Sequence, residues 1–377
     1  MEEISNTYSL TEAKVAKMER DPVKTVIMAS MIGTAIEFFD FYAYGTAAAT
    51  YFPNVFFPSV TPTIAMILSL LTFGVAFVAR PLGSLLFGHF GDKLGRKRAL
   101  FGSFTELGAP IGFFLSNGLY VILETVLTKS QMVEFGWRVP FVASAVLVVF
   151  GLWVRRKMQE TPLFRLAQKR DNVKKAPLAQ VFTKNWKQIL QGTFIMAVSY
   201  TFFFLLSTWS LSYGTAVLGF DSREFLMLLM GSIVVFAGMI VYSSILSDRF
   251  GRRTVLLAGT AAIFVFSFVF PFFFQGHQNV VGTLFFLLVG FLAMGVIYGP
   301  VGAMLPELFP TSTRYSGAGI AYNMSAIIGA AFAPTIASWL VGQWGIHAVG
   351  YYLAFMSLVS IVALLLTKET KSVDYTK

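Results

Sequence analysis

Two carboxylates, Glu37 and Asp40, lie inside the first long apolar stretch of this 377-residue chain. They are three residues apart, so on a helix their side chains share nearly one face. At 1.5 Å per residue, Glu37 lies roughly 20 Å from the polar end of the stretch. A buried, unpaired acid takes up a proton rather than keep its charge, which is the chemistry that proton coupling needs. The alternative is a structural acid tied to a neighbouring helix.

A second set of charges occurs in two copies of one short loop motif. The first copy consists of Gly88, Asp92, Gly95, Arg96 and Lys97, and the second of Ser244, Asp248, Arg249, Gly251, Arg252 and Arg253. The Asp can accept hydrogen bonds at a helix N-terminus, and the basic residues can pair with acids of the other half. Two copies at matching positions predict a gate that forms in one conformation and breaks in another. A plain basic turn is the alternative.

The elements around these motifs read as membrane-spanning helices. The chain is 56% hydrophobic and 13% charged, with 40 Phe and 32 Gly. Apolar runs near twenty residues recur, each long enough to cross roughly 30 Å of hydrocarbon. We predict an all-α polytopic membrane protein whose ten spans are 24–47, 63–88, 104–123, 138–154, 188–210, 225–246, 254–274, 281–304, 318–341 and 347–367.

The basic residues orient these spans. With the N-terminus inside, nearly all of the 29 Lys and Arg fall on cytoplasmic tails and loops. Lys129, Arg138 and Arg223 fall outside, and Arg80 lies within a span. This agrees with the positive-inside rule and predicts a bacterial inner-membrane protein with both termini cytoplasmic. The net charge of +10 therefore needs no nucleic-acid partner, because topology and attraction to anionic lipid account for it.

The spans form two unequal halves. We predict a cytoplasmic tail (1–23), an N-terminal half of four spans (24–154), a basic linker (155–187), a C-terminal half of six spans (188–367) and a second tail (368–377). Both copies of the loop motif follow the second span of their half. The first half is shorter by the length of one helical hairpin, which places the absent pair of spans between Leu100 and Phe101.

The paired motif resembles the loop signature of the major facilitator superfamily. Further stretches resemble its metabolite:proton symporter branch, which includes shikimate, α-ketoglutarate, citrate and proline/betaine carriers: "GTAIEFFDFYAYG" (33–45), "FVARPLGSLLFGHFGDKLGRKR" (77–98), "GWRVPF" (136–141), "ETPLF" (160–164) and "PELFPTSTRYSGAG" (306–319). The resemblance implies two six-helix halves around a central cavity, with rocking of the halves. Here the third and fourth helices are missing, and in the family the fourth helps line the cavity.

The resemblance also implies which spans line the cavity. Their polar and aromatic candidates for substrate contact are Tyr200, Trp209, Tyr298 and Asn323; the alternative for each is packing or an interfacial belt. We expect Arg80 to brace the loop, although it could contact an anionic substrate. Related carriers tend to have an uncharged residue at the position of Glu106, for which we predict no role. Glu307 and Arg314 flank a cytoplasmic turn, where an ion pair is the expected arrangement.

Signatures of enzymes are absent from the sequence. The three His lie in separate loops, Cys is absent and no P-loop occurs, so we expect no cofactor and the proton as coupling ion. The leading hypothesis is a symporter of a small organic metabolite, either an organic acid or a zwitterion such as shikimate, a dicarboxylate or betaine. The alternative is a transport-inactive or regulatory remnant of such a carrier. A monomer is expected, with self-association possible because the first half is incomplete.

Overall fold

A computed structural model describes residues 28, 31–87, 106–157, 183–310 and 313–370. Within these ranges the chain forms helices and no strand. A first helix covers 31–50. It is followed by α2 (Phe52–Phe56), α3 (Pro62–Phe87), α5 (Gly108–Val126), α6 (Lys129–Glu134) and α7 (Val139–Lys157), and then by α10 (Trp186–Phe204), α11 (Ser210–Ala216), α12 (Ser222–Phe250), α13 (Arg252–Phe273), α14 (Val280–Glu307), α15 (Arg314–Ala326), α16 (Ala333–Trp344) and α17 (Ile346–Leu365).

The prediction of an all-helical membrane protein is confirmed. In the described ranges, seven helices are long and apolar enough to cross a membrane, and Pro62–Val78 and Gly136–Gly151 are shorter apolar helices. Each predicted span overlaps one of these helices or the first helix. Large apolar side chains on the outer faces are exposed, such as Val281 at 79% and Val75 at 63%, as expected where lipid covers them.

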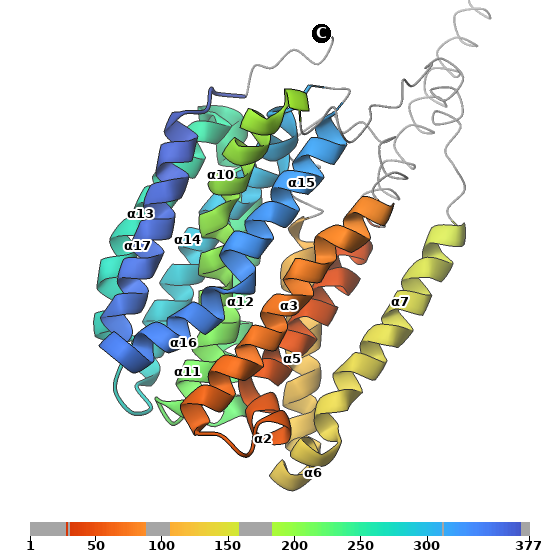
Figure 1. The fold of residues 1–377 in the computed structure, drawn as a ribbon, viewed down its shortest axis with the longest axis vertical. Helices are drawn as coiled ribbons and strands as arrows, with labels where there is room; N and C mark the ends of the chain where they lie inside the picture. The colour runs from red at the N-terminus through yellow and green to blue at the C-terminus, as the bar shows by residue number, and fades with distance from the viewer. Residues whose placement is uncertain (1–27, 29–30, 88–105, 158–182, 311–312, 371–377) are drawn as a thin grey trace, which may run out of the picture.

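Glycines with positive backbone φ angles separate two pairs of successive spans. Gly251 has φ 99° between α12 and α13, and Gly345 has φ 78° between α16 and α17. Residues with a Cβ rarely adopt these angles, so each helix ends there and the chain reverses. One end of the bundle carries the turn between α12 and α13 and the end of α17, which meet at Gly251 and Glu369, and we call it the motif end. The opposite end carries α2 and α6, and we call it the far end (Figure 1).

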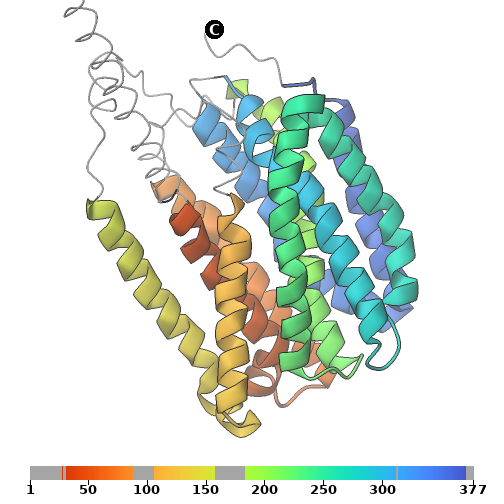
Figure 2. The ribbon, with the colours of Figure 1, turned by 180° about the vertical axis from the view of Figure 1, so that it is seen from behind.

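The two halves pack along two seams. The first helix, α3, α5 and α7 make up the N-terminal half, and α10 to α17 make up the C-terminal half. In one seam α5 lies beside α12, as Figure 2 shows, and in the other α3 packs against α15 and α16. At Gly74 of α3, a Cβ would lie 2.3 Å from the backbone oxygen of Ala331. The second seam therefore brings backbone almost onto backbone.

Helix α7 lies at the edge of the N-terminal half, beside α5 (Figure 1). Its apolar side chains face outward, with Val142, Val146 and Val149 exposed by 64%, 63% and 66%. The predicted linker 155–187 and the predicted break between Leu100 and Phe101 lie wholly or mostly outside the described residues.

Candidate functional site

A small polar chamber lies between the halves, nearer the far end of the bundle than the motif end. It is lined by residues of both halves: Tyr42, Thr46, Phe113, Asn117, Ser207, Thr208, Leu211 and Leu229. The space is about the size of a water molecule. Polar side chains from both halves therefore meet around one small space.

Among the residues that line the chamber, one fully buried hydroxyl has no hydrogen-bond partner. Thr46 Oγ1 donates to Asn117 Oδ1 at 2.7 Å, and Asn117 Nδ2 donates to the Phe113 carbonyl at 3.2 Å. The hydroxyl of Tyr42 is buried and has no hydrogen-bond partner among the described residues. A buried polar group without a partner is costly, so this hydroxyl is available to a water or to a substrate.

A local change of helix type aims two of the lining residues. Between α10 and α11 the chain forms a π-helix over Leu205–Trp209, which contains Ser207 and Thr208. Such π segments occur often at functional sites because they redirect side chains within a continuous helix. The first helix approaches this segment closely, since a Cβ on Gly45 would lie 2.8 Å from Thr208 Oγ1.

The halves are tied together at the far end through Glu124 of α5. The hydroxyl of Tyr51, from the N-terminal half, donates to Glu124 Oε1. Ser222 Oγ, at the start of α12, donates to the same oxygen at 2.8 Å. The Ser222 bond crosses from one half to the other, so it joins the two halves at the far end.

A second tie, this one exposed, lies beside the first. Lys129 Nζ contacts Asp221 Oδ1 at 2.9 Å across the halves. The hydrogen bond from Lys129 lowers the pKa of the Asp221 carboxyl, and the same bond raises the pKa of the Lys129 ammonium. Both groups are therefore charged over the whole physiological pH range.

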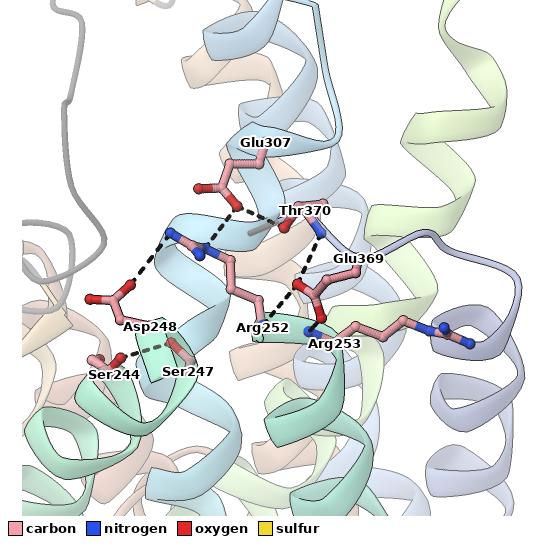
Figure 3. Close-up of polar contacts among 8 residues, drawn as sticks. All are labelled: Ser244, Ser247, Asp248, Arg252, Arg253, Glu307, Glu369 and Thr370. Carbon is pink, nitrogen blue, oxygen red and sulfur yellow. Dashed lines mark hydrogen bonds and ion pairs between the residues drawn. The ribbon is translucent and has the colours of Figure 1, made fainter. Parts of the chain in front are cut away.

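The second copy of the loop motif forms a compact network at the motif end (Figure 3). Arg252 Nε lies 2.8 Å from Glu307 Oε2, and these two side chains are 7% and 6% exposed. Arg252 Nη2 lies 3.6 Å from Asp248 Oδ1. Thr370 Oγ1 donates to Glu307 Oε2 at 2.7 Å. The network joins α12, α13, α14 and the segment after α17.

A carboxylate also covers the start of α13. Glu369 accepts hydrogen bonds from the backbone N–H groups of Arg252 at 2.9 Å and Arg253 at 3.1 Å (Figure 3). This is the favourable charge at a helix N-terminus, although the acid is Glu369 and not the Asp that the sequence indicated. Arg253 donates from its guanidinium to the carbonyls of Leu364 and Leu365.

The other members of the motif are placed as follows. Arg249 is exposed, with its guanidinium 5.3 Å from the Phe250 ring centroid. The contacts of Arg252 given above lie within one half, whereas the sequence indicated pairing between halves. Gly88, Asp92, Gly95, Arg96 and Lys97 lie outside the described residues, so the gate stays a prediction.

Glu37 and Asp40 are both exposed on the first helix. Asp40 Oδ1 accepts a hydrogen bond from Ser144 Oγ of α7 at 3.0 Å, which is the tie to a neighbouring helix that the sequence left open. Neither acid lines the polar chamber. Arg80 belongs to α3, but its side chain lies outside the described part.

The four residues predicted to contact the substrate differ in how far they are buried in the protein. Tyr200 and Tyr298 are buried, and Tyr298 packs 5.4 Å from the Phe236 ring. Trp209 is buried and stacks on Tyr213 at 5.1 Å. Asn323 is half-buried and donates to the carbonyl of Gly319 in its own helix at 2.8 Å.

Glu106 is a residue whose position the sequence did not reveal. It lies two residues before the start of α5 at Gly108 and contacts α14 and α15 of the other half. Tyr322 donates to Glu106 Oε1 at 3.3 Å. The sequence signals were a charge at the start of an apolar span and the uncharged residue that related carriers tend to have there. In the described ranges, no group of three or more His, Asp or Glu could hold a metal ion.

The comparisons with known proteins agree with this architecture. The family model described as Major Facilitator Superfamily matches residues 99–330. The inner membrane metabolite transport protein YhjE of Escherichia coli is 41% identical, over 92% of this chain and 94% of its own length. The chain belongs to the major facilitator superfamily. It is a membrane transporter of metabolites and not an enzyme.

Other members of the superfamily extend the comparison. The proline/betaine transporter of Escherichia coli is 28% identical over 96% of this chain and 86% of its own length. The solved structure of the xylose transporter XylE from E. coli covers 93% of this chain and 99% of its own, with a TM-score of 0.67 and 14% identity, which shows a shared fold.

The alignment with YhjE also bears on length. It runs over 415 positions, whereas this chain has 377 residues. The relative therefore has residues with no counterpart here.

Proposed function

We propose that the protein is a proton-coupled symporter that carries a small organic acid or zwitterion across a bacterial inner membrane, with both termini cytoplasmic. The observation that carries this proposal is the polar chamber between the halves, lined by Tyr42, Thr46 and Asn117 on one side and Ser207 and Thr208 on the other. The far end is closed by ties between the halves. A site closed at one end fits one state of alternating access.

Proton coupling is proposed on the acids of the first helix. Glu37 and Asp40 lie at membrane depth, where an ionised carboxylate costs about 2.5–3.5 kcal/mol on insertion scales. Asp40 has Ser144 as a hydrogen-bond donor, which stabilises its charged form. We assign proton loading to Glu37 ahead of Asp40, because at 1.5 Å per residue Glu37 lies nearer the middle of its predicted span, 24–47. A membrane potential of 100 mV supplies about 2.3 kcal/mol for each charge that moves inward.

Uptake into proteoliposomes tests this function. An imposed inward pH gradient should drive accumulation of the substrate, with substrate-dependent alkalinisation outside. Glu37→Gln should abolish the alkalinisation, whereas Glu134→Gln, which changes an exposed acid at the far end, should not. Alkalinisation that survives in Glu37→Gln would contradict the coupling assignment.

We propose a second candidate function because YhjE has residues that this chain lacks. A carrier without two spans could be inactive in transport and act as a regulatory or assembling subunit. Well-folded protein without flux of shikimate, dicarboxylates, proline or glycine betaine would favour this second function.

A further inference from the structure

One loop of the C-terminal half leads into the residues that tie the two halves together at the far end. The α11–α12 loop (217–221) ends at Asp221, and Ser222 follows as the first residue of α12. Asp221 contacts Lys129 at 2.9 Å, and Ser222 donates a hydrogen bond to Glu124 at 2.8 Å. Both contacts between the halves therefore depend on where this loop lies.

A second loop of the same half, the α13–α14 loop (274–279), holds the first one in place. The backbone N–H of Gln278 donates to the carbonyl of Leu218 at 2.8 Å. The side-chain amide of Gln278 donates to the carbonyl of Gly219 at 2.9 Å. The loops also touch beside these bonds, because a Cβ on Gly219 would lie only 2.5 Å from Nε2 of His277.

Gln278 makes these contacts from a strained backbone conformation. Among the described residues it is the one non-glycine residue with a positive φ, at 49°. Residues with a Cβ adopt such angles rarely, and they persist where the surrounding contacts fix them. The next residue, Asn279, accepts a hydrogen bond from the backbone N–H of Gly282 at 3.0 Å and caps α14. The strained turn thus joins the start of α14 to the α11–α12 loop.

The α11–α12 loop is itself firmly packed. Leu218 and Phe220 are only 3% and 5% exposed. The ring of Phe220 packs edge-on against Phe225 of α12, with the centroids 5.6 Å apart. The backbone N–H of Phe220 donates to the carbonyl of Gly214 at 3.0 Å. A displacement at Leu218 or Gly219 is therefore passed on to Asp221 and Ser222.

We propose that Gln278 is a positioning residue for closure of the far end. Its two hydrogen bonds hold the α11–α12 loop where Asp221 and Ser222 reach the N-terminal half. Gln278 does not line the chamber, so it acts through the loop and not on the substrate. The inference rests on the carrier function, because closure of one end is a step of alternating access, but it depends on neither the substrate nor the coupling ion.

Distances between spin labels on the two halves measure this closure. Val126→Cys on α5 and Val281→Cys on α14 provide exposed positions outside both loops. The full chain is measured in nanodiscs without substrate, and its thermal unfolding is recorded alongside. Opening of the far end should add a longer distance component. The readout is the ratio of the longer component to the shorter one.

The first pair of variants tests the side-chain amide. Gln278→Ala removes the hydrogen bond to Gly219 and should raise the ratio about two- to tenfold, the usual net effect of one hydrogen bond. Gln275→Ala is the matched control, because Gln275 lies in the same loop but donates to the carbonyl of Phe272 in the preceding helix, at 3.2 Å. This control should keep the wild-type ratio.

The second pair tests the contact from the other loop. Gly219→Ala should raise the ratio about tenfold or more, because its Cβ would meet the His277 ring and displace the loop. Gly345→Ala is the matched control: its φ of 78° strains Ala as much as the 75° of Gly219, but no atom lies within 4 Å of its added Cβ. It should lower the unfolding temperature and leave the ratio unchanged. His277→Ala, added to Gly219→Ala, should restore the ratio.

The outcomes separate this inference from the carrier function. A wild-type ratio in Gln278→Ala overturns the inference. So does an equal rise in the control variants, because loss of stability alone would then open the far end. If Gly219→Ala does not fold, the pair Gln278→Ala and Gln275→Ala decides. Shifted ratios in a chain that carries no metabolite into proteoliposomes would sink the carrier function alone, and uptake with unshifted ratios would sink the inference alone.

Discussion

Arg252 and Glu307 form an ion pair that is buried at both ends, with side chains 7% and 6% exposed. Contacts from Asp248 to Arg252 and from Thr370 to Glu307 take the place of the water molecules that the pair lost on burial. A buried pair contributes little net stability, but removal of one partner leaves an uncompensated charge. We therefore expect the pair to matter more for the cost of its disruption than for its own strength.

The first prediction concerns this pair. Glu307→Gln should destabilise the protein by about 3–5 kcal/mol, because it leaves the buried Arg252 guanidinium with only the more distant Asp248 carboxylate, at 3.6 Å. The double variant Arg252→Met with Glu307→Met should recover much of this loss, since apolar groups of similar size need no partner. Thermal unfolding in detergent measures both. Glu134→Gln, an exposed acid, is the control, and equal midpoints for it and Glu307→Gln would refute the prediction.

The second prediction concerns pH at the far end. Lys129 lowers the pKa of the Asp221 carboxyl. The stabilisation that the charged carboxylate contributes is therefore fully present above the ordinary Asp pKa and is lost as the pH falls through the lowered pKa. The pKa of the Lys129 ammonium is raised. The stabilisation that the charged ammonium contributes is therefore fully present below the ordinary Lys pKa and is lost as the pH rises through the raised pKa. The tie should therefore be constant from about pH 5 to about pH 9.

Spin labels at Val126→Cys and Val217→Cys, both exposed positions at the far end, measure this. The chain has no native Cys, so only the introduced thiols react. We expect one distance distribution across that pH range and a longer component in Asp221→Asn at neutral pH. The change should be small, because exposed ion pairs contribute about 1 kcal/mol at most. A distribution that shifts between pH 6 and pH 8 would contradict the assignment.

Single residues also mark what a sequence can and cannot reveal. Glu37 and Asp40 stand out because a carboxylate inside an apolar span is rare. Glu106 also stands out as a charge, but its partner does not, because it accepts a hydrogen bond from Tyr322, which is 216 residues away in the chain. The unused hydroxyl of Tyr42 is likewise visible only once both halves are packed.

At the scale of helices, the spans could be predicted because length and apolar composition decide them. The predicted span 254–274 and helix α13 (Arg252–Phe273) differ by two residues at the start and one at the end. The π-helices over Leu205–Trp209 and Ile327–Ala331 could not be predicted, because hydropathy does not distinguish one helix type from another. One of them holds two lining residues of the chamber, so sequence reasoning missed how that part of the site is built.

The third prediction concerns the seam between α3 and the π-helix that ends at Ala331. Gly74→Val should destabilise this conformation by about 1–3 kcal/mol, because the added atoms meet a backbone oxygen that cannot move aside. Gly231→Val is the control within α12, since its added Cβ meets nothing within 4 Å. Thermal unfolding and the far-end spin-label distance report the effect. Equal stability of the two variants would mean that the seam is looser than the geometry indicates.

At the scale of the whole molecule, the fold is lopsided. The C-terminal half has α13 and α14 packed against its other helices, and the N-terminal half shows no counterpart to them among the described residues. Helix α7 consequently lies at the edge with apolar side chains facing outward. The absence of an even number of spans, as the sequence analysis predicts, would leave the orientation of every later span unchanged, so the charge pattern would still predict one consistent topology.

The last prediction tests that topology directly. Lys129 begins α6 at the far end of the bundle, and Lys368 follows α17 at the motif end. Lys129→Cys and Lys368→Cys therefore place single thiols at opposite ends of the helix bundle, in a chain that has no other Cys. In intact cells an impermeant maleimide should label Lys129→Cys and leave Lys368→Cys unlabelled until the membrane is permeabilised, because the basic end is retained in the cytoplasm. The reverse pattern would invert the proposed orientation. Labelling of both thiols from outside would mean that the two ends share one side of the membrane, and alternating access through the chamber would then be impossible.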